Sequence, residues 1–249
     1  MNRQPRYHAL LAVFALFLAL PPAALSQNYE ELRANLVREI GLNVFDTRDY
    51  IGKRMLHERV MNVMGKVPRH EFVPDEYRGR AYKNRPLPIG FGQTISQPYI
   101  VALMTDLLEL EAGDVVLEVG TGSGYQTAVL AELVKQVYTI EIIEELSHQA
   151  SLRLGELAYD NIELRLGDGY YGWPDHGQFD AIIVTAAASY IPPPLVDQIR
   201  PGGIMVIPVG NQFQVQHLTM VSKDLTGKVT TRQVLPVRFV PLTGNRPAK

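Results

Sequence analysis

Apolar residues along this chain follow two different periods, which alternate through the second half of the sequence. Short continuous apolar runs are typical of buried parallel strands, and apolar residues spaced by three or four are typical of amphipathic helices. Strands are predicted over residues 115–119, 136–140, 162–166, 179–184 and 204–209, followed by a hairpin of 216–223 and 228–234. Helices are predicted over residues 29–40, 54–67, 98–110, 125–135, 144–159 and 192–200. This alternation predicts an α/β fold with a doubly wound parallel sheet, over which the N-terminal helices lie.

The first predicted strand runs into a helix through the glycine-rich sequence VVLEVGTGSGYQ, residues 115–126. Glycines permit tight turns and the close approach of a ligand to bare backbone, and a helix that starts there offers unpaired N–H groups. The dinucleotide fingerprint has two residues between its second and third glycines, whereas only Ser123 separates Gly122 from Gly124. The stretch therefore predicts a nucleotide-type site of another kind, with a turn that serves only packing as the alternative.

Other polar residues fall where predicted strands end. Glu141 follows the second strand, about twenty residues beyond Gly120, where an acidic residue can reach ribose hydroxyls. Asp168 follows the third strand and Thr185 the fourth. The carboxyl ends of parallel strands share one edge of the sheet, where ligands bind, so we expect these side chains to lie around one site.

Residues 82–97 are rich in proline and glycine and directly precede a helix that starts at Pro98. A long segment of this kind is usually functional or disordered. Thr94 and Ser96 are its candidate functional side chains. The alternative is that one of them only caps the following helix.

The first 26 residues carry the features of a secretory signal peptide. Arg3 and Arg6 precede the apolar run 9–20, and Pro21 and Pro22 end it. Small residues then lead up to Gln27. We therefore expect cleavage before Gln27, a single domain over 27–249 and no stable membrane anchor, because the run is too short to span a bilayer. An uncleaved anchor and a misassigned start codon are the alternatives.

Charge and composition exclude several functions. Loss of the two leader arginines leaves 22 Lys and Arg against 26 Asp and Glu, a net charge of −4, which does not favour a nucleic-acid partner. The chain has no cysteine, so disulfides, thiol nucleophiles and cysteine metal sites are excluded. His57 and His70 lack neighbours at ligand spacing, so we expect structural roles for them and no metal site. The protein is expected to be a monomer.

Five segments together resemble the protein-L-isoaspartate O-methyltransferase family. They are GFGQTISQP at 90–98, LEVGTGSGYQTA at 117–128, GDG at 167–169, FDAIIVTAA at 179–187 and RFVPL at 238–242. The resemblance covers roughly residues 56–243. It implies a Rossmann-like sheet that binds S-adenosylmethionine (SAM), with proteins or peptides that carry isoaspartyl residues as substrates.

The resemblance also implies roles for individual residues. Ser96 matches the active-site serine of the family. The implied cofactor-binding residues are Thr94, Glu118, Gly120, Gly122, Gly124, Glu141, Asp168, Gly169 and Thr243. Within this set Gly120, Gly122 and Gly124 would border the methionine portion of SAM. Glu141 would hold the ribose, and Asp168 and Gly169 would contact the adenine. The implied substrate-binding residues are Ile95, Ser96, Phe239, Val240 and Leu242.

The implied reaction transfers a methyl group to the free α-carboxylate of an isoaspartyl residue and begins repair through a succinimide. Two alternatives are a methyltransferase of the same fold that acts on a small-molecule acid, and a module that binds damaged peptides without turnover. The leader predicts export, to a bacterial periplasm, whereas a cytoplasmic location is usual for the family.

Overall fold

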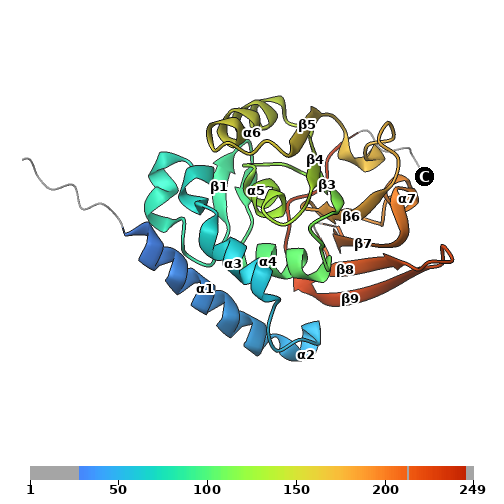
Figure 1. The fold of residues 1–249 in the computed structure, drawn as a ribbon, viewed down its shortest axis with the longest axis horizontal. Helices are drawn as coiled ribbons and strands as arrows, with labels where there is room; N and C mark the ends of the chain where they lie inside the picture. Colours follow the sequence, from blue (N-terminus) through green and yellow to red (C-terminus); the bar gives the residue numbers. More distant parts are fainter. Residues whose placement is uncertain (1–27, 212, 245–249) are drawn as a thin grey trace, which may run out of the picture.

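The structure, a computed structural model, describes residues 28–211 and 213–244 (Figure 1). The predicted signal peptide lies outside the described residues. The strands are β1 (Leu87–Gly90), β2 (Gln93–Ile95), β3 (Val115–Val119), β4 (Gln136–Glu141), β5 (Ile162–Leu166), β6 (Phe179–Val184), β7 (Ile199–Val209), β8 (Gln216–Lys223) and β9 (Val229–Val237). The α-helices are α1 (Tyr29–Asp46), α2 (Arg48–Ile51), α3 (Glu58–Lys66), α4 (Pro98–Leu107), α5 (Tyr125–Ala131), α6 (Glu144–Glu156) and α7 (Pro193–Asp197). Short 3₁₀ helices are η1 (Arg69–Phe72), η2 (Asp75–Arg80) and η3 (Gly169–Tyr171).

A seven-stranded sheet in the order β5-β4-β3-β6-β7-β8-β9 forms the centre of the molecule. Its first five strands are parallel, and β8 and β9 extend it as an antiparallel hairpin. The glycine-rich stretch follows β3, which lies between β4 and β6 where the strand order reverses. The predicted fold class is confirmed, and β3 ends at the switch point where such sheets bind ligands.

Alternate residues of the strands enter two separate hydrophobic cores. Val116 of β3 belongs to the core on one face of the sheet, which also contains residues of α1, α3, α4, α5 and α6. Leu117 and Val119 pack on the opposite face with Trp173 and with Leu195 of α7. This division follows from the two-residue side-chain period of a strand, and burial on both faces explains why the sequence of β3 is a nearly continuous apolar run.

The N-terminal helices form an outer layer on the first of these cores. Leu36, Ile40 and Val44 of α1 are almost completely buried there, and α1 runs along the outside of α3 and α4 (Figure 1). The apolar stripe predicted for residues 29–40 thus continues for more than another turn. Across residues 28–211 and 213–244, the helices all fall short of the length and apolar character needed to span a bilayer.

The predicted helix 54–67 starts later than expected, at Glu58. Asp106, whose side chain is 1% exposed, explains the difference. Its carboxylate accepts a hydrogen bond from the backbone N–H of His57 at 2.6 Å and pairs with Lys53 at 2.6 Å. These contacts hold the segment before Glu58 in a non-helical conformation, with His57 at the N-cap.

The predicted helix 192–200 and strand 204–209 also have different bounds, because α7 ends at Asp197 and β7 already begins at Ile199. Ile199 pairs with Phe179 and Ile204 with Ala181, so the extra residues form a bulge within the strand. A side chain at Gly203 would lie 2.7 Å from the Asp180 carbonyl oxygen. The expected turn is therefore a glycine-dependent irregularity inside one strand.

Residues 82–97 contain an antiparallel hairpin, β1 and β2, that the sequence pattern did not predict. Gly90, Phe91 and Gly92 form its turn, all with positive φ. The hairpin leads directly into α4, which starts at Pro98. The proline-rich segment is thus ordered, and it carries Thr94 and Ser96 to the edge of the sheet.

Candidate functional site

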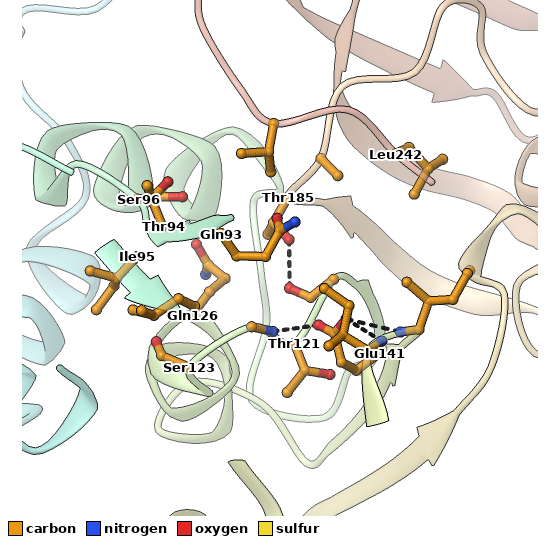
Figure 2. A pocket seen from close by; sticks show the side chains of 18 of the residues that line it. Gln93, Thr94, Ile95, Ser96, Thr121, Ser123, Gln126, Glu141, Thr185 and Leu242 are labelled. Carbon is orange, nitrogen blue, oxygen red and sulfur yellow. Dashed lines mark hydrogen bonds between the residues drawn. The ribbon is translucent and has the colours of Figure 1, made fainter. Parts of the chain in front are cut away.

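An open cavity lies at the carboxyl edge of the sheet, with a volume of about 770 Å³ that includes space open to solvent (Figure 2). Its walls come from the β1–β2 hairpin, the loops that follow β3, β4 and β6, and the C-terminal segment 240–243. The residues implied by the resemblance that line it are Thr94, Ile95, Ser96, Gly120, Gly122, Glu141, Gly169, Val240, Leu242 and Thr243. Segments far apart in the sequence therefore meet at one site.

Gly120 lies in this wall where a side chain would not fit. Its φ is +99°, and an added Cβ would lie 2.4 Å from the Thr185 Oγ1 atom. The Thr185 hydroxyl donates to the Gly120 carbonyl oxygen at 2.6 Å, so the loop is fastened to the end of β6. Glycine is required at this position for close packing, and the same glycine borders the cavity. The loop can therefore serve both close packing and ligand binding.

Glu141 ends β4 and fixes a carboxylate in the cavity wall. Its Oε2 atom accepts from the Gly122 N–H at 2.7 Å, and its Oε1 atom accepts from the N–H groups of Ile142 and Ile143 at 2.9 and 3.0 Å (Figure 2). Carboxylate oxygens together accept about four hydrogen bonds. The three backbone donors found among the described residues therefore leave capacity for a ligand hydroxyl.

Asp168 is missing from the described lining of the cavity, but its chain neighbour Gly169 lines it. Its Oδ1 atom accepts from the Tyr170 N–H at 3.0 Å. Its Oδ2 atom is buried and has no hydrogen-bond partner among residues 28–211 and 213–244. A buried acceptor without a partner is energetically costly, so this oxygen fits a ligand that brings an N–H donor.

Glu118 does not face the cavity as the resemblance implied, and is missing from its described lining. It lies on the same side of β3 as Val116, so the strand period directs it beneath the glycine-rich loop, where it is completely buried. The hydroxyls of Thr127 and Thr139 donate to its Oε2 atom, and Oε1 is unpartnered within the described part of the chain. Burial raises the pKa of Glu118 to about 8, so Glu118 supports the loop as a largely neutral acid near neutral pH.

Gly124 also lies away from the cavity. It is the residue before α5, with φ +87°, and an added Cβ would lie 3.3 Å from Leu154 of α6. Its position is thus explained by packing between α5 and α6, and the described lining of the cavity does not include it.

Ser96 and Thr94 reach the cavity from the end of the β1–β2 hairpin. The cap position of α4 is taken by Gln97, so the reading of Ser96 or Thr94 as the helix cap is wrong. Arg69, which is completely buried, donates from Nη2 to the Ser96 carbonyl oxygen at 2.7 Å and from Nε to that of Ala81 at 2.9 Å. Burial lowers the pKa of Arg69 to about 10.

A groove adjoins the cavity between the hairpin and the segment that follows β9. It shares Thr94, Ser96, Thr185 and Val240 with the cavity. Phe239 lines the groove and not the described wall of the cavity. The Gln216 side chain holds the backbone of Phe239 in place. Its Oε1 atom accepts from the Phe239 N–H at 2.6 Å, and its Nε2 atom donates to the Phe239 carbonyl oxygen at 3.2 Å.

Sequence reasoning missed several polar residues of the cavity wall, namely Gln93, Thr121, Ser123 and Gln126. All four lie within the segments 90–98 and 117–128 that carry the family resemblance, and their place in these segments is the only sequence signal that could have identified them. Arg69 was missed as well, because no sequence pattern marks a charged residue that will be completely buried.

The histidines have the structural surroundings that were expected. His70 stacks on Tyr29 with 3.7 Å between ring centroids, and its Nδ1 atom lies 2.6 Å from the Tyr82 hydroxyl. His57 caps α3. Over the described ranges, no group of three or more histidine, cysteine or acidic side chains is placed to hold a metal ion.

The raised pKa of Glu118 predicts a pH dependence of stability. In the folded protein the pKa of Glu118 is about 8, whereas its ordinary value, taken for the unfolded chain, is 4.5. Between these pH values the folded state binds more protons than the unfolded state, so the free energy of unfolding falls as the pH rises. We expect Glu118→Gln to become more stable relative to the parent protein from pH 5 to pH 8, as measured by urea unfolding. Glu163→Gln, at an exposed position of β5, is the control and should follow the parent. A parallel course for Glu118→Gln and the parent would contradict the raised pKa.

Residues 48–247 match the model of the family described as Protein-L-isoaspartate(D-aspartate) O-methyltransferase (PCMT). The chain is 65% identical over 211 residues to Protein-L-isoaspartate O-methyltransferase 2 of Polaromonas sp. (strain JS666), covering 85% of this chain and 100% of that protein. It is 58% identical to Protein-L-isoaspartate O-methyltransferase 2 of Syntrophobacter fumaroxidans, covering 95% of this chain and 96% of that protein.

Two solved structures are similar over most of the chain. One is a protein-L-isoaspartate O-methyltransferase with a TM-score of 0.75 and 25% identity, covering 86% of this chain and 66% of that one. The other is a putative protein-L-isoaspartate O-methyltransferase from Plasmodium falciparum in complex with S-adenosyl-L-homocysteine. Its TM-score is 0.71 at 26% identity, and the match covers 88% of this chain and 99% of that one. On the family match and the identities to its relatives, this chain belongs to the protein-L-isoaspartate(D-aspartate) O-methyltransferase family.

Proposed function

We propose that this chain transfers a methyl group from SAM to the free α-carboxylate of L-isoaspartyl residues in proteins or peptides. The observation that carries the proposal is the junction of cavity and groove at Thr94, Ser96, Thr185 and Val240. A methyl donor in the cavity and a peptide in the groove would meet at this junction. The family match supplies the chemistry of both ligands.

The residues around the cavity fit SAM. The unpartnered Oδ2 atom of Asp168 suits the exocyclic amino group of adenine. Glu141 retains capacity to accept from a ribose hydroxyl, and Gly120 presents bare backbone to the rest of the molecule. Each feature suits a group that SAM carries.

SAM supplies a methyl group made electrophilic by the sulfonium to which it is bonded. The isoaspartyl α-carboxylate is already ionised at neutral pH, so it needs no general base. Ser96 is proposed to donate its hydroxyl proton in a hydrogen bond to this carboxylate and to orient one oxygen for attack. Positioning then provides most of the rate enhancement. The methyl ester afterwards closes to a succinimide with loss of methanol, and hydrolysis returns part of it to normal aspartate.

The direct test is the transfer of tritiated methyl groups from SAM to a synthetic isoaspartyl peptide and to its normal aspartyl twin. We expect labelling of the isoaspartyl peptide alone, because only this peptide presents the free α-carboxylate on an isopeptide backbone. Equal labelling of both peptides would refute the proposal. Absence of labelling with both would favour a small-molecule acid as substrate, or a binding module without turnover.

Replacement of Ser96 tests its role. We expect Ser96→Ala to lower kcat/KM for the isoaspartyl peptide roughly ten- to a hundredfold, because one donor to the reacting carboxylate is lost. The affinity for S-adenosylhomocysteine and the melting temperature should change little. Ser151→Ala, at an exposed position of α6, is the matched control. A lower melting temperature with normal turnover would assign Ser96 a purely structural role.

Glu141 is proposed to hold the ribose. Glu141→Gln replaces a carboxylate that accepts three backbone hydrogen bonds by an amide with one acceptor oxygen. We expect the affinity for S-adenosylhomocysteine to fall roughly tenfold or more in calorimetry. Glu144→Gln, in the exposed first turn of α6, should bind as the parent does. An unchanged affinity in Glu141→Gln would remove Glu141 from the site.

We further propose that the protein is exported and has no stable membrane anchor. We also propose that it is a monomer and has no nucleic-acid partner. The support is the order of basic, apolar and small residues before Gln27, together with the negative charge of the remainder. Cell fractionation and N-terminal sequencing should find a chain that starts near Gln27 outside the cytoplasm. A chain with an intact Met1 in the cytoplasmic fraction would overturn export and leave the enzymatic proposal unaffected.

A further inference from the structure

Gln126 presents a buried polar atom to the cavity. It lies in the first turn of α5, is only 7% exposed, and directs its side chain into the cavity (Figure 2). Its Nε2 atom donates to the Thr105 hydroxyl of α4 at 3.0 Å. Its Oε1 atom has no hydrogen-bond partner in the ranges that the structure describes. The Nε2 end of this amide is thus anchored, and the Oε1 end can accept a hydrogen bond from a ligand in the cavity.

The anchoring group determines which end of the amide faces the ligand. The Thr105 hydroxyl has a single proton, which it donates to the Val101 carbonyl oxygen at 2.8 Å. Thr105 can therefore only accept from Gln126, and this requirement assigns Nε2 to the anchored end. The atom left for the cavity is the oxygen, which accepts hydrogen bonds and cannot donate them.

The position of Gln126 identifies the part of the cofactor that it meets. Gln126 lines the cavity, and the described lining of the adjoining groove does not include it, so it faces the cofactor rather than the peptide. Glu141, the proposed ribose ligand, lies on the other side of the cavity (Figure 2). Asp168, the proposed adenine ligand, follows β5, Glu141 ends β4 and Gln126 follows β3, and these strands are neighbours in the order β5-β4-β3. The amino-acid end of SAM, which carries an ammonium and a carboxylate, therefore lies beyond the ribose, on the side of Gln126. Of these two groups, only the ammonium can donate a hydrogen bond.

We infer that Gln126 Oε1 accepts a hydrogen bond from the α-ammonium group of SAM, and that Thr105 positions it to do so. This contact assigns Gln126 to the recognition of the amino-acid end of the cofactor. The inference rests on the proposed SAM-dependent function.

Calorimetry with two ligands tests the inference: S-adenosylhomocysteine and its analogue in which hydrogen replaces the α-amino group. The parent protein should bind the analogue roughly tenfold more weakly, because a charge-assisted hydrogen bond is lost. Gln126→Leu should bind S-adenosylhomocysteine roughly tenfold more weakly than the parent, and the analogue within about twofold of the parent. Thr105→Val frees the amide to turn, so it should weaken S-adenosylhomocysteine binding more than analogue binding. Gln149→Leu, at an exposed position of α6, should match the parent with both ligands.

Equal binding of the two ligands by the parent would overturn the inference without any variant. An equal loss for both ligands in Gln126→Leu, with its melting temperature unchanged, would also overturn it, because Gln126 would then act only through the shape of the cavity. If Gln126→Leu does not fold, Thr105→Val serves as the test. An equal loss of affinity for both ligands in Thr105→Val would then overturn the inference. Failure of the parent to bind S-adenosylhomocysteine at all would instead refute the proposed function, and the inference with it.

Discussion

The carboxylate of Glu141 is the constraint on which the geometry of the site depends. It accepts N–H groups from Gly122 in the loop after β3 and from Ile142 and Ile143 after β4. These loops follow neighbouring parallel strands, and without the carboxylate their partly buried N–H groups would need other acceptors. A charge-assisted bond to a carboxylate is stronger than a neutral one, so the two loops are held in a fixed relation. On the opposite side of β3, Thr185 fastens the same glycine-rich loop to the end of β6.

The hairpin that carries Ser96 depends on a second buried charge. Arg69 lies over the Tyr125 ring with 4.7 Å to its centroid and donates to the carbonyl oxygens of Ser96 and Ala81. Burial of a guanidinium is unfavourable unless its N–H groups are satisfied. Its bonds to these carbonyl groups therefore stabilise one arrangement of the segment before α4. Tyr125 begins α5, so the hairpin and the glycine-rich loop are joined through this side chain.

The sheet could be predicted from the sequence because strands buried on both faces have distinctive apolar runs. The bounds predicted for β3, β5 and β6 agree with the structure. The β1–β2 hairpin could not be predicted, since it is short and its turn depends on positive φ at Gly90, Phe91 and Gly92 rather than on a repeating pattern.

At the site, Glu141 and Ser96 both line the cavity, where strand ends and a helix start converge, as their positions in the sequence predict. Glu118 was not, although its alternation with Val116 along β3 already indicated the face on which it is buried. The roles of Arg69 and Gln126 depend on contacts across the fold with Ser96 and Thr105, which a local sequence pattern does not encode.

The C-terminal segment 240–243 has a consequence for how the two ligands influence one another. It is fixed to the end of β6 by hydrogen bonds between Ala187 and both Val240 and Leu242, each at 2.8 Å. Val240 belongs to the walls of both the cavity and the groove. A ligand that shifted this segment in one site would alter the wall of the other, and this would couple the binding free energies of cofactor and peptide. Thermodynamic linkage makes such coupling reciprocal: a cofactor that favours peptide binding is itself retained more tightly by the peptide-bound protein.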